Sequence, residues 1–260
     1  MNTIKVTIKD KVAIISLDRG KANAINEEMV DDLQQMFLNI EKDDNILGVI
    51  LGGKEGFFSA GLDLIELYDY DELRIKEFWN KFLNLTVSLA SFKKPLIAAI
   101  SGHCPAGGCV LAICCDYRVM AEGKYIIGLN EVPVGIIVPN SIFQLYAFWI
   151  GNAPAYRFLL EGRLMGTEEA LKVNLIDEIE KMPSLLTAAE RQMNKYLQLN
   201  SVTWQQSKLN LRKELLYKIN VDQSEYLNMM LKQWWSPSTR SILKTIINNL
   251  KSPSPSPPAH

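Results

Sequence analysis

The sequence predicts an α/β fold in which strands and helices alternate, followed by a purely helical C-terminal part. A buried strand, a glycine turn and a helix occur in that order at residues 46–92 and again at 96–115, and repeats of this ββα-like kind are typical of α/β cores. From residue 184 onward only helical patterns occur. We therefore expect an α/β core at 1–183, a helical module at 184–251 and a disordered Pro/Ser tail at 252–260.

The spacing of apolar residues predicts each element in turn. The first half yields strands at 3–9, 12–17, 46–51 and 96–100, helices at 27–41 and 71–92, and a glycine-bearing loop at 101–109 that opens onto a buried helix ending before Asp116. The second half yields extended segments at 117–121, 125–129 and 175–179, and helices at 139–149, 153–161, 167–173, 184–199, 201–217, 222–235 and 237–250.

Composition excludes several classes of function. The formal net charge is -1 and the pI is about 6.2, which gives no electrostatic basis for binding nucleic acid or an anionic membrane. No apolar run is long enough to cross a bilayer, and residues 1–10 alternate lysines with β-branched residues. We therefore expect a cytoplasmic protein.

The four cysteines all lie within residues 104–115, and no two of them form a Cys-x-x-Cys pair. We expect them to be buried thiols that form neither a disulfide framework nor a metal site.

The candidate chemistry rests on backbone amides, because His103 is the one histidine outside the tail and no nucleotide-binding glycine motif is present. The segments 60–62 and 106–108 each follow a buried strand and precede a helix. Their N–H groups are suited to an oxyanion hole, in which one donor is worth about 3–4 kcal/mol of transition-state stabilisation. The alternative, equally compatible with these residues, is that both turns only begin or end helices.

One carboxylate, Glu131, lies in an otherwise uncharged run at 125–139. Apolar surroundings raise the pKa of a carboxyl group, so Glu131 is a candidate proton carrier near neutral pH. The alternative is a turn glutamate that faces solvent. Helix capping or ion pairing is the expected role of Asp63 and Asp116, which lie beside predicted helices.

Five segments resemble the crotonase superfamily, which includes enoyl-CoA hydratases and isomerases, within a match over about residues 6–179. They are Ala-Asn-Ala-Ile-Asn at 22–26, Phe-Ser-Ala-Gly-Leu-Asp at 58–63, the run at 100–109, Cys-Asp-Tyr at 115–117, and the run at 128–135. The resemblance implies a spiral of ββα units, a C-terminal trimerisation module, a homotrimer or dimer of trimers, and an acyl-CoA thioester substrate with no separate cofactor. It also implies roles for single residues. The N–H groups of Leu62 and Gly107 would form the oxyanion hole, and the substrate-binding residues would be Lys21, Ala22, Ala24, Ala60, Gly61, Leu62, Asp63, Leu64, Gly107 and Asn130.

The residue at position 110 distinguishes hydratases from isomerases in this superfamily. Hydratases carry a second glutamate three residues after the central glycine, and here that position is Val110. Hydration needs an acid and a base on one water, whereas moving a double bond needs one base. The resemblance therefore implies an isomerase that converts 3-enoyl-CoA to 2-trans-enoyl-CoA in unsaturated fatty-acid oxidation, with Glu131 as the base.

Two other hypotheses are compatible with the sequence. The first is another enolate-forming acyl-CoA enzyme, either a decarboxylase or a residual hydratase, because it would share the oxyanion hole. The second is a CoA-fold protein without catalysis, or a relative that binds RNA, although the near-neutral charge disfavours RNA. We expect the wall of the acyl pocket to include Leu67, Phe78, Phe82 and Ile137.

Overall fold

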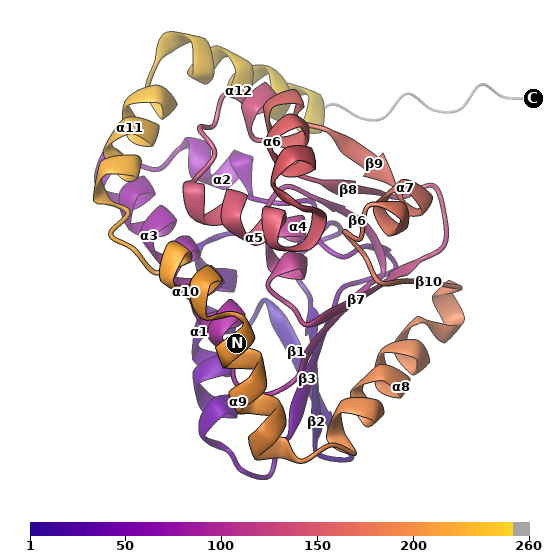
Figure 1. Ribbon diagram of the computed structural model, residues 1–260. Helices are drawn as coiled ribbons and strands as arrows, with labels where there is room; N and C mark the ends of the chain where they lie inside the picture. The colour runs from indigo at the N-terminus through magenta and orange to yellow at the C-terminus, as the bar shows by residue number, and fades with distance from the viewer. Residues whose placement is uncertain (252–260) are drawn as a thin grey trace, which may run out of the picture.

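Two β-sheets form the centre of the computed structural model, which describes residues 1–251 (Figure 1). The larger sheet has the order β1 (Ile4–Lys9), β2 (Val12–Leu17), β3 (Gly48–Gly52), β5 (Leu96–Ile100), β7 (Tyr117–Ala121), β10 (Glu178–Glu180). The smaller has the order β4 (Gly56–Phe57), β6 (Gly102–Pro105), β8 (Ile126–Gly128), β9 (Leu164–Gly166). The β1–β2 and β8–β9 pairs are antiparallel and the remaining pairs are parallel. The predicted disorder of residues 252–260 concerns a segment outside the described residues.

The chain repeats a unit of two strands and a helical segment, which is the ββα unit that the family resemblance implies. Each unit places its first strand in the larger sheet and its second in the smaller sheet. The units are β3–β4 with α2 (Leu64–Tyr68) and α3 (Glu72–Ser91), β5–β6 with α4 (Gly107–Ile113), and β7–β8 with η1 (Val132–Val134) and α5 (Asn140–Ile150). Because β4, β6 and β8 are parallel neighbours, the segments that follow them meet at one edge of the smaller sheet.

The central strands of the larger sheet are buried on both faces. Ile50, Ile97 and Val119 belong to a core cluster with α8 (Leu185–Leu197), which packs on β3, β5 and β7. Their neighbours along the strands, such as Val49 and Ala98, belong to the main core on the other face. A strand with both faces covered lacks polar alternation, which explains the continuous apolar runs in the sequence.

The remaining helices surround this core (Figure 1). Their bounds are α1 (Glu27–Lys42), α6 (Asn152–Glu161), α7 (Thr167–Lys172), η2 (Met182–Ser184), α9 (Ser201–Leu211), α10 (Lys213–Ile219), α11 (Ser224–Trp234) and α12 (Pro237–Lys251). In the C-terminal part, α10 packs on α3 and α5, α11 on α3, and α12 on α2 and η1. The helical character predicted from residue 184 onward is confirmed for the residues that the structure describes.

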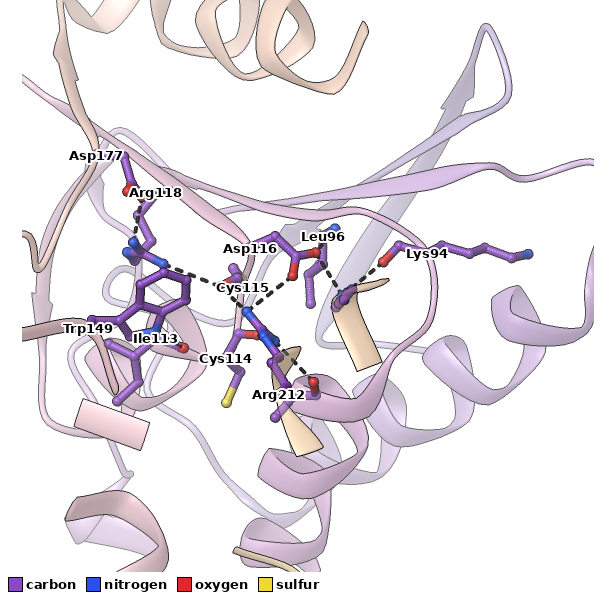
Figure 2. A network of polar contacts seen from close by, with 12 residues as sticks. Lys94, Leu96, Ile113, Cys114, Cys115, Asp116, Arg118, Trp149, Asp177 and Arg212 are labelled. Atoms are coloured by element: carbon purple, nitrogen blue, oxygen red, sulfur yellow. Dashed lines mark hydrogen bonds and ion pairs between the residues drawn. The ribbon is translucent and has the colours of Figure 1, made fainter. Parts of the chain in front are cut away.

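A buried cluster of charges attaches α9 and α10 to the core (Figure 2). Asp116 accepts from Lys208 Nζ at 2.7 Å and from Arg212 Nη2 at 3.1 Å, and the same carboxylate accepts from Leu96 N at 2.8 Å. Arg212 also donates to three backbone carbonyls at the ends of α3 and α4, those of Ala90, Cys114 and Cys115. Burial lowers the pKa of Lys208, and the Asp116 carboxylate partly offsets this. The expected ion-pairing role of Asp116 is confirmed.

A second buried arginine lies beside this cluster (Figure 2). The Arg118 guanidinium stacks on the Trp149 ring at 3.7 Å and pairs with Asp177 at 2.6 Å. Its Nε donates to the carbonyl of Leu175 at 2.8 Å. These contacts join β7, α5 and the segment before β10 within one block.

Several predicted boundaries differ from the structure. The run at 101–109 was predicted as a loop, yet it contains the strand β6, and β4, β9 and α2 were not predicted. The helix predicted at 201–217 is two helices that meet at Arg212, whose side chain turns inward to the charge cluster. The last strand begins at Glu178, three residues later than predicted, because Asn174 adopts φ +63° and Leu175 and Ile176 pack into the core.

Candidate active site

A cavity of about 420 Å³ lies where the segments after β4, β6 and β8 meet. Its lining is mostly apolar. The predicted site residues that line it are Ala22, Ala24, Ala60, Leu62, Asp63, Leu64, Gly107, Asn130 and Glu131. Two predicted residues do not line it. Lys21 is exposed and precedes the lining residue Ala22, and Gly61 is buried between the lining residues Ala60 and Leu62.

Two backbone N–H groups adjoin each other in this cavity. Ile25 pairs with the strand-like segment around Leu62, since Ile25 N donates to Gly61 O and Asp63 N donates to Ile25 O, both at 2.8 Å. This pattern directs the N–H of Leu62 away from Ile25. Gly107 begins α4, so its N–H has no acceptor within that helix. A Cβ built on Gly107 would lie 3.3 Å from Leu62 N, which puts the two donors side by side.

Glycine is required at 61 by both conformation and space. Gly61 has φ +90°, and a Cβ there would lie 2.9 Å from the Ala106 Cβ and 3.2 Å from Gly107 N. On the other side, Ala106 has φ +49° and ψ -124°, a conformation that L-residues avoid. The Ala106 N–H donates to Gly128 O at 2.8 Å, which fixes this peptide against β8.

Two buried polar residues hold the loop before Leu62. Ser59 Oγ donates to Asn23 O at 2.7 Å and accepts from Gly61 N at 3.1 Å. Asn23 has φ +50°, is fully buried, and donates from Nδ2 to Phe58 O at 3.1 Å. No sequence pattern predicts a role for either side chain. Their small size and polarity inside the glycine-bearing loops were the available signal.

Glu131 also lines the cavity and is buried, with 6% of its surface exposed. Its Oε2 has no hydrogen-bond partner among the described residues. Burial raises the pKa of the Glu131 carboxyl from 4.5 to about 7, and a hydrogen bond from its own backbone N–H offsets this only in part. The prediction that apolar surroundings raise this pKa agrees with the structure.

Asp63 also lines the cavity, yet its oxygens are fully engaged. Oδ1 accepts from the N–H groups of Ile65 and Glu66 at 3.1 Å and so caps α2, and Oδ2 pairs with Arg19 at 2.7 Å. The predicted capping role is confirmed. Among the residues that line the cavity, Glu131 is therefore the one carboxylate with an uncommitted oxygen.

The apolar wall differs in part from the prediction. Phe82 lines the cavity as expected, whereas Leu67 and Phe78 are completely buried in the core and Ile137 is not part of the lining. Other lining residues were not predicted: Trp79, Val134, Ile136, Ile142, Ile246 and Leu250. Val110 lines the cavity one turn after Gly107, so this position faces the same space as Glu131.

The remaining reactive side chains lie elsewhere. The four cysteines are buried, and burial raises the pKa of each thiol, so none is a thiolate at neutral pH. His103 packs between the rings of Phe57 and Tyr125, outside the cavity lining. Within residues 1–251 there is no group of three or more potential metal ligands, and no helix is long and apolar enough to span a membrane.

Known proteins share both sequence and fold with this chain. A family model described as enoyl-CoA hydratase/isomerase matches residues 7–246. The mitochondrial enoyl-CoA delta isomerase 1 of Mus musculus is 38% identical over 204 residues, 78% of this chain and 71% of that protein. The short-chain-enoyl-CoA hydratase of Clostridium acetobutylicum is 28% identical over 197 residues, 75% of each. The crystal structure of human mitochondrial delta3-delta2-enoyl-CoA isomerase superposes with a TM-score of 0.92 at 28% identity, over 96% of this chain and 98% of that one.

Proposed function

This chain belongs to the enoyl-CoA hydratase/isomerase family, and we propose that it acts as a 3,2-trans-enoyl-CoA isomerase with Glu131 as its proton carrier. One observation carries this proposal. The cavity presents a single uncommitted carboxylate together with two adjacent backbone donors, those of Leu62 and Gly107. That set is sufficient for moving a proton across an enolate.

The proposed reaction transfers one proton between two carbons of the acyl chain. Glu131 removes a proton from the α-carbon of 3-enoyl-CoA, and the thioester oxygen takes up the negative charge of the resulting dienolate. The N–H groups of Leu62 and Gly107 donate to that oxygen. Glu131 then returns the proton to the γ-carbon, so that the double bond shifts from C3–C4 to C2–C3. The carbon skeleton is neither oxidised nor reduced, and the step requires no cofactor beyond the CoA thioester itself.

The raised pKa of Glu131 suits a group that must both take and return a proton. A pKa of about 7 lets the carboxylate exist at neutral pH and makes it a stronger base than an ordinary glutamate. The lack of a partner on Oε2 leaves that oxygen free to accept a carbon-bound proton once substrate is present.

The size of the cavity supports an acyl ligand with its nucleotide end outside. About 420 Å³ is near the low end of small-molecule pockets, roughly 300–1,000 Å³. The apolar wall suits the acyl chain, and Ala60 to Leu64 would lie along the thioester and pantetheine, with Asn130 beside the acyl group. Lys21, Ala22 and Ala24 at the rim would then contact the nucleotide end, with Lys21 attracting its phosphates.

The alternative activities, hydration and decarboxylation, differ in whether they need an acidic residue at position 110. Hydration calls for a second acid that acts on the same water, and the side chain that faces the cavity at this position is a valine. Hydration is the second candidate activity, because the chain is also similar to the short-chain-enoyl-CoA hydratase of Clostridium acetobutylicum. A decarboxylase or other enolate-forming activity would use the same two donors.

Self-association as a trimer or a dimer of trimers is part of this proposal. Its support is a set of exposed apolar side chains on α9, α10 and the segments beside them: Leu199, Val202, Leu211 and Tyr217, each more than half exposed. Sedimentation would test the stoichiometry.

The cytoplasmic location expected from the sequence stays a prediction, because the mouse relative is named as a mitochondrial protein.

A coupled assay separates the candidates. We expect conversion of 3-hexenoyl-CoA to the 2-trans product, with little hydration of 2-trans-hexenoyl-CoA and no release of CO₂ from malonyl-CoA or glutaconyl-CoA. Hydration that exceeds isomerisation would favour a hydratase. Tight acyl-CoA binding without turnover of any thioester would favour a protein that binds CoA thioesters without catalysis.

A further inference from the structure

The C-terminal helix α12 supplies one wall of the cavity, although it lies far from the other lining residues in the sequence. Ile246 and Leu250 line the cavity, while Leu243 and Ile247 are buried against the core. The spacing of these four residues is that of one helical face. In Figure 1, α12 crosses beside α2, and the packing contacts of α12 include both α2 and η1.

Specific contacts fix α12 against both sides of the site. The Arg240 guanidinium stacks on the Tyr68 ring at 3.3 Å and donates to Tyr68 O at 3.0 Å, which ties α12 to α2. Thr239 Oγ1 donates to Gly135 O at 3.3 Å, which ties α12 to the end of η1. The helix α2 follows Leu62, and η1 follows Glu131. These contacts therefore fix the position of α12 relative to both Leu62, the proposed oxyanion donor, and Glu131, the proposed base.

We propose that α12 determines which acyl chain lengths this protein accepts, through the side chains of Ile246 and Leu250. This inference rests on the proposed acyl-CoA substrate. Ile246 is half-buried, whereas Leu250 is 64% exposed, so Leu250 lies at the mouth and Ile246 farther in. The volume at position 246 then limits how many methylenes fit beyond the reacting carbons, and Arg240 acts as a positioning residue that holds the wall in place.

Changing the volume at one position tests this role. Ile246→Ala enlarges the cavity and should raise the ratio of kcat/KM for 3-dodecenoyl-CoA to that for 3-hexenoyl-CoA, by on the order of fourfold for each methylene that gains contact. Ile246→Trp fills the same space and should lower that ratio. Ile242→Ala is the matched control, because Ile242 lies one turn earlier on α12 and is not part of the cavity lining.

Binding gives a second readout that does not depend on turnover. Calorimetry with hexanoyl-CoA and dodecanoyl-CoA should show opposite shifts of the affinity ratio in Ile246→Ala and Ile246→Trp, and no shift in Ile242→Ala. Equal changes for both chain lengths, or an unchanged ratio in both Ile246 variants, would overturn the proposal. Absence of turnover in the wild type alongside length-dependent binding would contradict the isomerase assignment and leave the role of α12 supported. Thermal unfolding verifies that each variant is folded.

Discussion

The side chain of Ser59 joins the backbone of Asn23 to the peptide that precedes Leu62. Its hydroxyl donates to Asn23 O at 2.7 Å and accepts from Gly61 N at 3.1 Å, and both Ser59 and Asn23 are fully buried. The orientation of the Leu62 N–H depends on the peptide plane after Gly61. A hydroxyl that is not part of the cavity lining is thereby connected to one of the two proposed oxyanion donors.

Ser59→Ala should lower kcat for 3-hexenoyl-CoA while KM changes little. The substitution leaves a buried N–H and a buried carbonyl without their partner, at a cost of about 1–3 kcal/mol in stability. It also removes the restraint on the Gly61 N–H, so that only the Ile25 N–H to Gly61 O bond still orients the next peptide, which carries the Leu62 N–H; this weakens a contact that matters most in the transition state. Steady-state kinetics at substrate concentrations below and above KM would measure kcat and KM.

Ser101→Ala is the control for that experiment. Ser101 is also buried and donates to Lys54 O at 2.7 Å, but it does not touch the Gly61 peptide. Both variants should lose comparable stability, and only Ser59→Ala should lose kcat beyond the loss of folded protein. Equal kcat in the two variants would mean that the Ser59 hydrogen bonds serve stability alone.

Glu131→Gln should abolish isomerisation without abolishing acyl-CoA binding. The amide cannot accept a carbon-bound proton, so the rate should fall by about 10²–10⁴-fold, the usual contribution of a positioned base. In the wild type, kcat/KM should rise with pH through about 7 and then level off, because the carboxylate is the active form. A Gln variant that retains wild-type turnover would rule out Glu131 as the base.

The same residue should make the folded state less stable as pH rises. The carboxyl has a pKa near 7 when folded and near 4.5 when unfolded, so between these values the folded state binds more protons. The free energy of unfolding should therefore decrease from pH 4.5 to 7 by on the order of 3 kcal/mol and then stay level for this group. Glu131→Gln should remove that decrease, which urea unfolding at several pH values would measure.

Sequence patterns could predict the long elements and many of the residues that line the cavity, because both depend on local signals. Buried strands such as β5 are continuous apolar runs, and Asp71 caps α3 at the start that the sequence predicts. The glycines at 61 and 107 marked the turns where backbone donors are exposed. Glu131 stood out because its neighbours along the chain are apolar.

The missed features depend on contacts between distant segments. The strand β4 has only two residues, and β6 contains glycine and proline, so neither carries the β-branched pattern of a strand. Their pairing with each other and with β8 makes them strands. Ile246 joins the cavity wall through the path of α12 across the fold, and no spacing in the sequence near 60 or 107 could indicate it.

Ala106→Gly should stabilise the protein even though glycine usually weakens folded structure. Ala106 holds φ +49° and ψ -124°, a conformation that costs an L-residue about 1–3 kcal/mol and costs glycine little. We expect a higher melting temperature. Ala112→Gly, in the last turn of α4, provides the contrast, because replacing a helical alanine by glycine should cost up to roughly 1 kcal/mol. A lower melting temperature in both variants would show that the Ala106 methyl contributes more through packing than it costs in strain.

Arg212→Met should cause a larger loss of stability than removal of any exposed ion pair. The change removes the Arg212 donor from the carbonyls of Ala90 and Cys114 and from one oxygen of Asp116, all of them buried, and breaking a buried pair in this way costs about 3–5 kcal/mol. Arg191→Met is the comparison, since Arg191 pairs with Glu178 at a site where the arginine side chain is 50% exposed. That loss should stay below about 1 kcal/mol.

Urea unfolding of both arginine variants measures these differences directly. Because Arg212 donates at the carboxyl end of α4, the helix whose first residue is Gly107, the Arg212 variant should also lose kcat under conditions where it is still folded. A stability loss similar to that of Arg191→Met would mean that the buried cluster gains little from Arg212. The anchoring of α9 and α10 to the core would then rest on apolar packing and Lys208 instead.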